Sequence, residues 1–118
     1  MPEGTYAKGL AGESQAIAYL QNRGMVLLQQ RYRSPFGEID AIVRDGEAVV
    51  FVEVKARRTG RAGAGLIAVG ARKQARLLKT ALHYMAAYGC ECPMRFDVVE
   101  LTQDGINHIE NAFEGSEF

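Results

Sequence analysis

The sequence is poor in cysteine, and its two thiols, Cys90 and Cys92, stand almost side by side. A disulfide framework needs more cysteines at wider spacings, and a single Cys-x-Cys is a weak metal signal, so we expect two reduced thiols. No apolar run approaches the ~20 residues that a membrane-spanning helix needs. The first ten residues also lack the apolar region of a signal peptide. These absences lead us to expect a cytoplasmic protein that does not associate with a membrane.

The sequence also lacks an excess of either charge, because its formal net charge at pH 7 is 0. A neutral total does not by itself indicate nucleic-acid binding. The distribution is uneven, however, since no acidic residue occurs between Val54 and Cys90. This segment holds eight of the fourteen lysines and arginines: Lys55, Arg57, Arg58, Arg61, Arg72, Lys73, Arg76 and Lys79. Such a basic region can attract phosphates, although a solvated helix face followed by a basic loop would have the same composition.

The length of 118 residues and the 47% apolar content indicate a single domain, residues 1–118, with one hydrophobic core. Apolar periodicity and turn signals predict helices over 5–23 and 66–88. They predict strands over 25–33, 38–44, 47–57 and 94–101, and a last short strand around 106–109. The order αβββαβ(β) predicts an α/β domain with three αβα layers, in which a central mixed sheet carries a helix on each side.

Two short segments place charged residues inside strands that otherwise read as core. Gly37-Glu38-Ile39-Asp40 is followed, after twelve intervening residues, by Glu53-Val54-Lys55. A two-residue loop at Asp45-Gly46 would set Glu38 opposite Glu53. Asp40 would then be the diagonal neighbour of Glu53, with a Cβ separation of ~7 Å. Because side chains alternate along a strand, these acids would share one face with Lys55.

Two carboxylates at that separation suit a hard divalent cation, and we predict Mg²⁺ or Mn²⁺ bound by Asp40 and Glu53. In a phosphodiesterase such a cation polarises the phosphate and lowers the pKa of the attacking water. Lys55 could orient that water or stabilise charge in the transition state. The alternative is a salt-bridged pair of strands at the rim of the sheet, in which Lys55 binds Glu53 or Asp40.

Other polar residues occupy positions that need a partner or a function. Glu13 lies on the apolar stripe of the first predicted helix, where it either pairs with an arginine or reaches the metal site as a further acid. Lys73 and Gln74 begin the second helix and form either a polar surface or contacts near the scissile phosphate. Arg95 and Asp97 share one face of a buried strand, and we predict a structural ion pair between them.

Several strings along nearly the whole chain, taken together, carry a family resemblance. They are Gly12-Glu13, Gly37-Glu38-Ile39-Asp40, Val50-Phe51-Val52-Glu53-Val54-Lys55, Arg95-Phe96-Asp97-Val98-Val99 and His108-Ile109. They resemble the YraN-like family of bacterial proteins, which is similar to the PD-(D/E)xK nucleases. The resemblance implies a restriction-endonuclease-like fold, close to that of archaeal Holliday-junction resolvases, with Mg²⁺ as cofactor. It implies a site made of Glu13, Asp40, Glu53 and Lys55.

The residues and the resemblance together predict a metal-dependent endonuclease that acts on DNA, including branched structures, as a monomer or a homodimer. Phosphates would be bound by Arg57, Arg58, Arg61, Arg72, Lys73 and Arg76, with Glu38 and Gln74 as auxiliary residues. Two alternatives stay open. The chain could be a nucleic-acid-binding module with little catalysis, or a structural or adaptor domain whose acids only form ion pairs. One departure from the family is Arg31, which stands where asparagine is usual.

Overall fold

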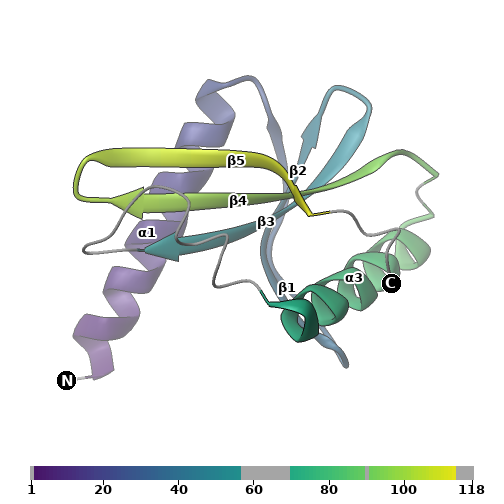
Figure 1. The fold of residues 1–118 in the computed structure, drawn as a ribbon, viewed down its shortest axis with the longest axis horizontal. Helices are drawn as coiled ribbons and strands as arrows, with labels where there is room; N and C mark the ends of the chain where they lie inside the picture. Colours follow the sequence, from purple (N-terminus) through teal and green to yellow (C-terminus); the bar gives the residue numbers. More distant parts are fainter. Residues whose placement is uncertain (1, 57–69, 90, 114–118) are drawn as a thin grey trace.

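In the part of the chain that the structure describes, five strands form one sheet between two helices (Figure 1). The computed structural model describes residues 2–56, 70–89 and 91–113, and side chains from residue 12 onward. The elements are α1 (Pro2–Asn22), β1 (Val26–Ser34), β2 (Gly37–Asp45), β3 (Ala48–Ala56), α3 (Ala71–Ala87), β4 (Met94–Thr102) and β5 (Gly105–Phe113). The predicted order and the αβα layering are therefore confirmed, except that the last strand is nine residues long rather than short.

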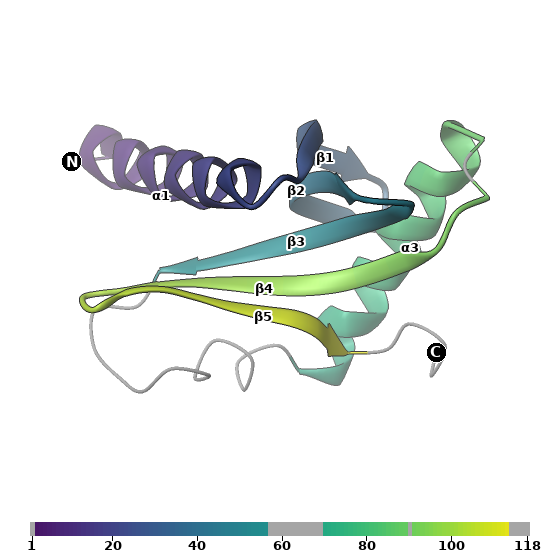
Figure 2. The same cartoon turned by 90° about the horizontal axis from the view of Figure 1, so that it is seen from above.

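The strands lie in chain order, and only β3 and β4 are parallel. A parallel pair needs a crossover connection, which the segment containing α3 provides. Figure 2 shows the sheet lying between α1 and α3. Because the two helices cover opposite faces, the domain has two cores. The α3 side is built around Ile42, Phe51, Leu77, Tyr84 and Phe96. The α1 side is built around Ala16, Leu20, Val43, Val50 and Val99.

The β2–β3 hairpin has a different register from the predicted one. Asp45 pairs with Ala48, so the two-residue loop is Gly46-Glu47 rather than Asp45-Gly46. Gly46 has φ 61°, and glycine is favoured at the first loop position of type II′ turns because it adopts positive φ without strain. The register ends at the Ala41–Val52 pair, and beyond it the Asp40 side chain contacts β3 by accepting a hydrogen bond from the backbone N–H of Val54. The predicted facing of Glu38 and Glu53 is therefore wrong, and Glu38 pairs with Arg33 of β1.

Strand β1 is irregular where it runs beside Asp40. The β1–β2 ladder passes from the Gln30–Ala41 pair to the Tyr32–Ile39 pair, and the intervening Arg31 has φ 51°. Left-handed backbone is uncommon for any residue with a side chain. The irregularity turns Ile39 into the α3-side core while Ala41 packs on the α1 side, although strict alternation would put both on one face. Asp40 therefore lies where the alternation of side chains along β2 is interrupted. Within the described residues, no helix is long and apolar enough to cross a membrane.

Candidate active site

The site is centred on two carboxyl groups, those of Asp40 on β2 and Glu53 on β3. The backbone N–H of Val54 donates a hydrogen bond of 2.8 Å to Asp40 Oδ2 and fixes that carboxyl group against β3. Glu53 is only 7% exposed. Burial, followed by the charge of Glu53 and a hydrogen bond between the two side chains, raises the pKa of Asp40 to about 7. Two acids are thus held together in a place where both cannot easily be ionised.

Two lysines reach the same Glu53 carboxylate from different elements. Lys55 extends from β3, with its Nζ 3.6 Å from Glu53 Oε2, and Lys73 extends from the first turns of α3 to pair with the same oxygen. Burial and then a hydrogen bond with Lys73 lower the pKa of Lys55. Burial opposes the charge on Lys73 as well, but hydrogen bonds with Glu53 and Lys55 raise its pKa. Lys55 is therefore the amine that more readily gives up a proton.

The third predicted acid, Glu13, lies at the edge of this group. Its Oε1 accepts a hydrogen bond of 2.8 Å from Arg31 Nε, and its charge contributes to the raised pKa of Asp40. A Cβ atom at Gly12 would lie only 3.1 Å from Leu101 Cδ1, so glycine there lets α1 pack closely on β4. The pairing of Glu13 with an arginine confirms one of its two predicted roles. Its role as a metal ligand stays a prediction.

Asp40 and Glu53 fit a divalent cation in charge and in donor type. Carboxylate oxygens are the ligands that Mg²⁺ prefers, and a cation between them would relieve the repulsion that raises the pKa of Asp40. Among the described side chains, no three His, Cys, Asp or Glu residues are already gathered as a metal cage. A metal at Asp40 and Glu53 would therefore complete its shell with water, as Mg²⁺ usually does.

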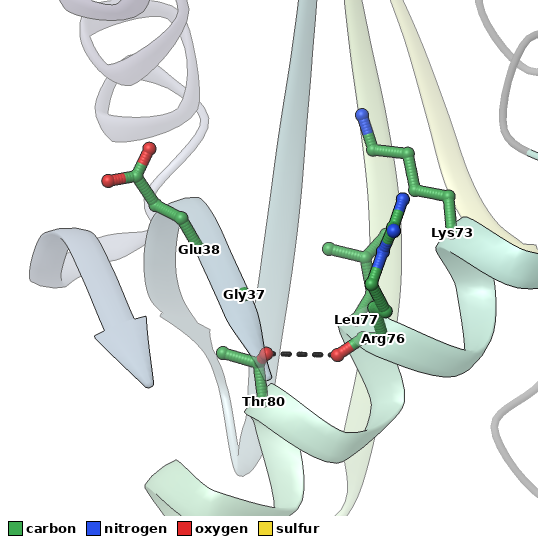
Figure 3. A pocket seen from close by; sticks show the side chains of 6 residues that line it. All are labelled: Gly37, Glu38, Lys73, Arg76, Leu77 and Thr80. Carbon is green, nitrogen blue, oxygen red and sulfur yellow. Dashed lines mark hydrogen bonds between the residues drawn. The ribbon is translucent and has the colours of Figure 1, made fainter. Parts of the chain in front are cut away.

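The remaining predicted residues are distributed around this centre. Glu38 lies outside the acid pair and binds Arg33, with 2.6 Å between its Oε2 and Arg33 Nε. Arg72 is exposed on α3 and Gln74 is half-buried there. A pocket of about 180 Å³ between β2 and α3 is lined by Gly37, Glu38, Lys73, Arg76, Leu77 and Thr80 (Figure 3). The predicted phosphate-binding residues Arg57, Arg58 and Arg61 lie outside the described residues.

One acid beside the site was missed by the sequence interpretation. Glu100 of β4 pairs with Lys55 in the parallel β3–β4 ladder, and its side chain is fully buried. Its Oε1 accepts a hydrogen bond of 2.8 Å from Asn107 Nδ2 on β5. The signal was its place two residues beyond Val98, at the inward-facing positions of an apolar strand. A buried acid at such a position needs partners, as Glu13 does.

The predicted ion pair of Arg95 and Asp97 is confirmed and belongs to a larger network. Arg95 Nε lies 2.9 Å from Asp97 Oδ1, and Arg95 Nη1 lies 3.0 Å from Asp45 Oδ2. His108 Nε2 lies 2.7 Å from Asp97 Oδ2, and the backbone N–H of Asn111 donates to Asp97 Oδ1 at 3.0 Å. This network joins β2, β4 and β5 and uses none of the residues of the acid pair, so we assign it a structural role.

Replacing Asp40 by asparagine should stabilise the protein above neutral pH. Since the pKa of Asp40 rises from 3.8 to about 7 on folding, the native state binds more protons between these values, and the free energy of unfolding falls as pH rises through them. The asparagine variant escapes this loss. We expect it to exceed the wild type by ~1–3 kcal/mol at pH 8 and to match it at pH 4, measured by urea unfolding. Equal stabilities of the wild type and Asp40→Asn at pH 8 would contradict the raised pKa of Asp40. The control is Asp104→Asn, in an exposed turn, which should change stability little at either pH.

Comparison with known proteins agrees with the resemblance seen in the sequence. The model of the uncharacterised protein family UPF0102 matches residues 12–101, which include Glu13, Asp40, Glu53, Lys55 and Lys73. A UPF0102 protein of Thermodesulfovibrio yellowstonii is 44% identical over 89% of this chain and 94% of its own. One of Syntrophus aciditrophicus is 46% identical over 90% of this chain and 87% of its own.

A slight structural likeness links the chain to the crystal structure of SSO0001, with a TM-score of 0.37 and 18% identity over 79% of this chain and 43% of that one. That likeness is too small to bear on function. The family match spans most of the chain, and the curated relatives are matched along nearly their whole length. By these matches the chain belongs to the uncharacterised protein family UPF0102.

Proposed function

We propose that this protein is a metal-dependent endonuclease that cleaves DNA, including branched structures. One observation carries the proposal: the carboxyl groups of Asp40 and Glu53 are in contact, and two lysines of unequal basicity converge on Glu53. An acid with a raised pKa beside a second acid, together with an adjacent amine whose pKa is lowered, is typical of sites that bind a metal and transfer protons.

Each side chain has a distinct task in this proposal. Asp40 and Glu53 would hold Mg²⁺ or Mn²⁺, which when bound polarises the phosphate and acidifies a water molecule. Lys55, held by Glu53 and more easily deprotonated than Lys73, would orient the attacking water. Lys73 keeps its proton and can bind a phosphate oxygen. Glu13, whose charge acts on Asp40, would supply a further acid once Arg31 releases it.

A nucleic-acid-binding module without catalysis is the second candidate. The observation that favours it is that both lysines already neutralise Glu53, which would let the site persist as ion pairs. This candidate predicts salt-dependent binding that survives Asp40→Asn. An adaptor domain predicts neither binding to DNA nor stabilisation by divalent cations.

The decisive experiment is incubation of the pure protein with a panel of linear, flapped and four-way branched DNA. We expect cleavage in Mn²⁺ or Mg²⁺ and none in Ca²⁺ or EDTA. The matched control is Asp40→Asn prepared in the same way, which should abolish cleavage because a metal ligand is lost. No cleavage of any substrate in either metal would overturn the proposal.

A second readout, thermal unfolding, does not depend on turnover. Metal at one hundred times its dissociation constant should stabilise the native state by ~2.7 kcal/mol. The effect should be larger at pH 8 than at pH 6, since Asp40, whose pKa is about 7, must lose its proton to bind the cation. Stabilisation that is the same at both pH values would show that Asp40 is not a ligand.

A further inference from the structure

The pocket between β2 and α3 combines positive charge with a backbone wall. Lys73 and Arg76 extend from α3 in the same direction along it (Figure 3). They are three residues apart, so they occupy the same face of the helix. Lys73 also binds Glu53, which places the pocket directly beside the acid pair. Its volume of about 180 Å³ suits a phosphate group with part of its sugar rather than a whole base pair.

Glycine at position 37 keeps this pocket open. Gly37 has φ 153°, and a Cβ atom there would lie 3.5 Å from Thr80 Oγ1 and 4.0 Å from Arg76 Cβ. Any side chain would strain the backbone and project into the space next to Arg76. The turn before it is anchored on α3, because Ser34 Oγ donates a hydrogen bond of 3.2 Å to Thr80 Oγ1. The wall and the cationic side of the pocket are thus held in a fixed relation.

An exposed aromatic ring adjoins the pocket on the same turn. Phe36 directly precedes Gly37 and is 45% exposed. Lys79 Nζ lies 5.9 Å from the centre of its ring, and the His83 ring lies 6.3 Å away, edge on. An aromatic ring beside a cationic groove is the combination that proteins use to bind single-stranded nucleic acid, with phosphates on the cations and bases on the ring. Lys73, Arg76 and Lys79 repeat every three residues and extend this surface along α3.

We propose that this pocket binds the backbone phosphate next to the scissile one, through Lys73 and Arg76, and that Phe36 stacks on an unpaired base of the same strand. The ligand is a nucleic-acid strand that is not paired at this position, because the faces of bases inside a duplex are already stacked. The inference rests on the proposed function, because only a nuclease has a scissile phosphate. Binding of a strand at the pocket, however, requires no metal and no cleavage. It would direct the site toward flaps, ends or junctions in which one strand leaves the duplex.

The test uses the ¹⁵N-labelled full chain in EDTA at low salt, followed by the amide signals of Phe36, Gly37 and Thr80. Inorganic phosphate, a single-stranded oligothymidylate and a blunt duplex of equal charge are titrated in turn. We expect these three signals to shift with phosphate and with oligothymidylate, and to shift far less with the duplex. Arg76→Gln should weaken both affinities about tenfold. Phe36→Ala should weaken the affinity for oligothymidylate about tenfold and leave the affinity for phosphate unchanged.

The matched control is Arg44→Gln, which removes an exposed arginine outside the pocket lining. It should change neither affinity. Equal losses in Arg44→Gln and Arg76→Gln would overturn the inference, as would oligothymidylate binding that moves no signal of the pocket. Unchanged affinity of Phe36→Ala for oligothymidylate would overturn the part of the inference in which Phe36 stacks on a base. Because no metal is present, a failure here leaves cleavage untouched, and an inactive enzyme leaves this result standing.

Discussion

Asp97→Ala is expected to lower the free energy of unfolding by ~3–5 kcal/mol, since it breaks a buried charge network from its centre. Asp97 is 1% exposed. Its two oxygens accept hydrogen bonds from Arg95 and the Asn111 backbone and contact His108. Although burial opposes its charge, the hydrogen bonds with His108 and Arg95 lower the pKa of Asp97. Truncation would leave the buried side of a guanidinium, an imidazole and a backbone N–H without their common acceptor.

Urea unfolding at pH 7 measures this effect, with Asp104→Ala in an exposed turn as the control that should change stability little. Asp97→Asn separates charge from shape, because the amide keeps one acceptor oxygen while losing the charge that Arg95 binds. It should fall between the wild type and the alanine variant. A loss below about 1 kcal/mol for Asp97→Ala would show that Arg95 is held by Asp45 instead, 3.0 Å away on β2.

The hairpin shows how far the sequence alone determines the site. The signal at Asp45-Gly46 correctly located the turn, but glycine is needed at the first loop position, which moved the loop by one residue. The new register changes the sum of paired residue numbers by two, so the paired residues 41–45 of β2 keep their predicted faces, whereas alternation fails between Ile39 and Ala41. Asp40 and Glu53 are in contact as predicted, although Asp40 lies one residue beyond the last β2–β3 pair, Ala41–Val52. Proximity was predictable from periodicity, whereas the separation depended on the turn geometry.

Contacts between distant elements were less predictable. The position of Glu13 on an apolar stripe indicated that it needs a partner. Its partner is Arg31, which has a left-handed backbone conformation in β1 that no local sequence pattern predicts. Glu100 was overlooked because its proximity to Lys55 depends on the parallel register of β3 and β4. The two strands are separated in the chain by the segment that contains α3, so their register cannot be read from either strand alone.

Lys55→Ala is expected to lower the rate of DNA cleavage by at least ~100-fold while the fold and the binding of DNA persist. The fold should persist because Lys55 lies at the end of β3, 3.6 Å from Glu53, and Lys73 remains paired with that carboxylate. The rate should fall because Lys55, whose pKa is lowered by burial and by Lys73, is the amine that would orient the attacking water in the proposed mechanism. Single-turnover cleavage in Mn²⁺, with binding measured in Ca²⁺, separates the two effects.

Two companion variants make the role of Lys55 specific. Lys55→Arg preserves positive charge but cannot lose its proton, so it should remain as slow as Lys55→Ala if the amine acts as a base, and should recover if it acts only as a charge. Lys73→Ala should weaken binding more than it lowers the single-turnover rate, because in the proposed mechanism Lys73 binds a phosphate of the substrate. The wild-type rate should rise between pH 6 and 8 as Asp40 loses its proton. Full activity in Lys55→Ala would remove the lysine from the mechanism and leave Asp40 and Glu53 as a metal site whose chemistry depends on another base.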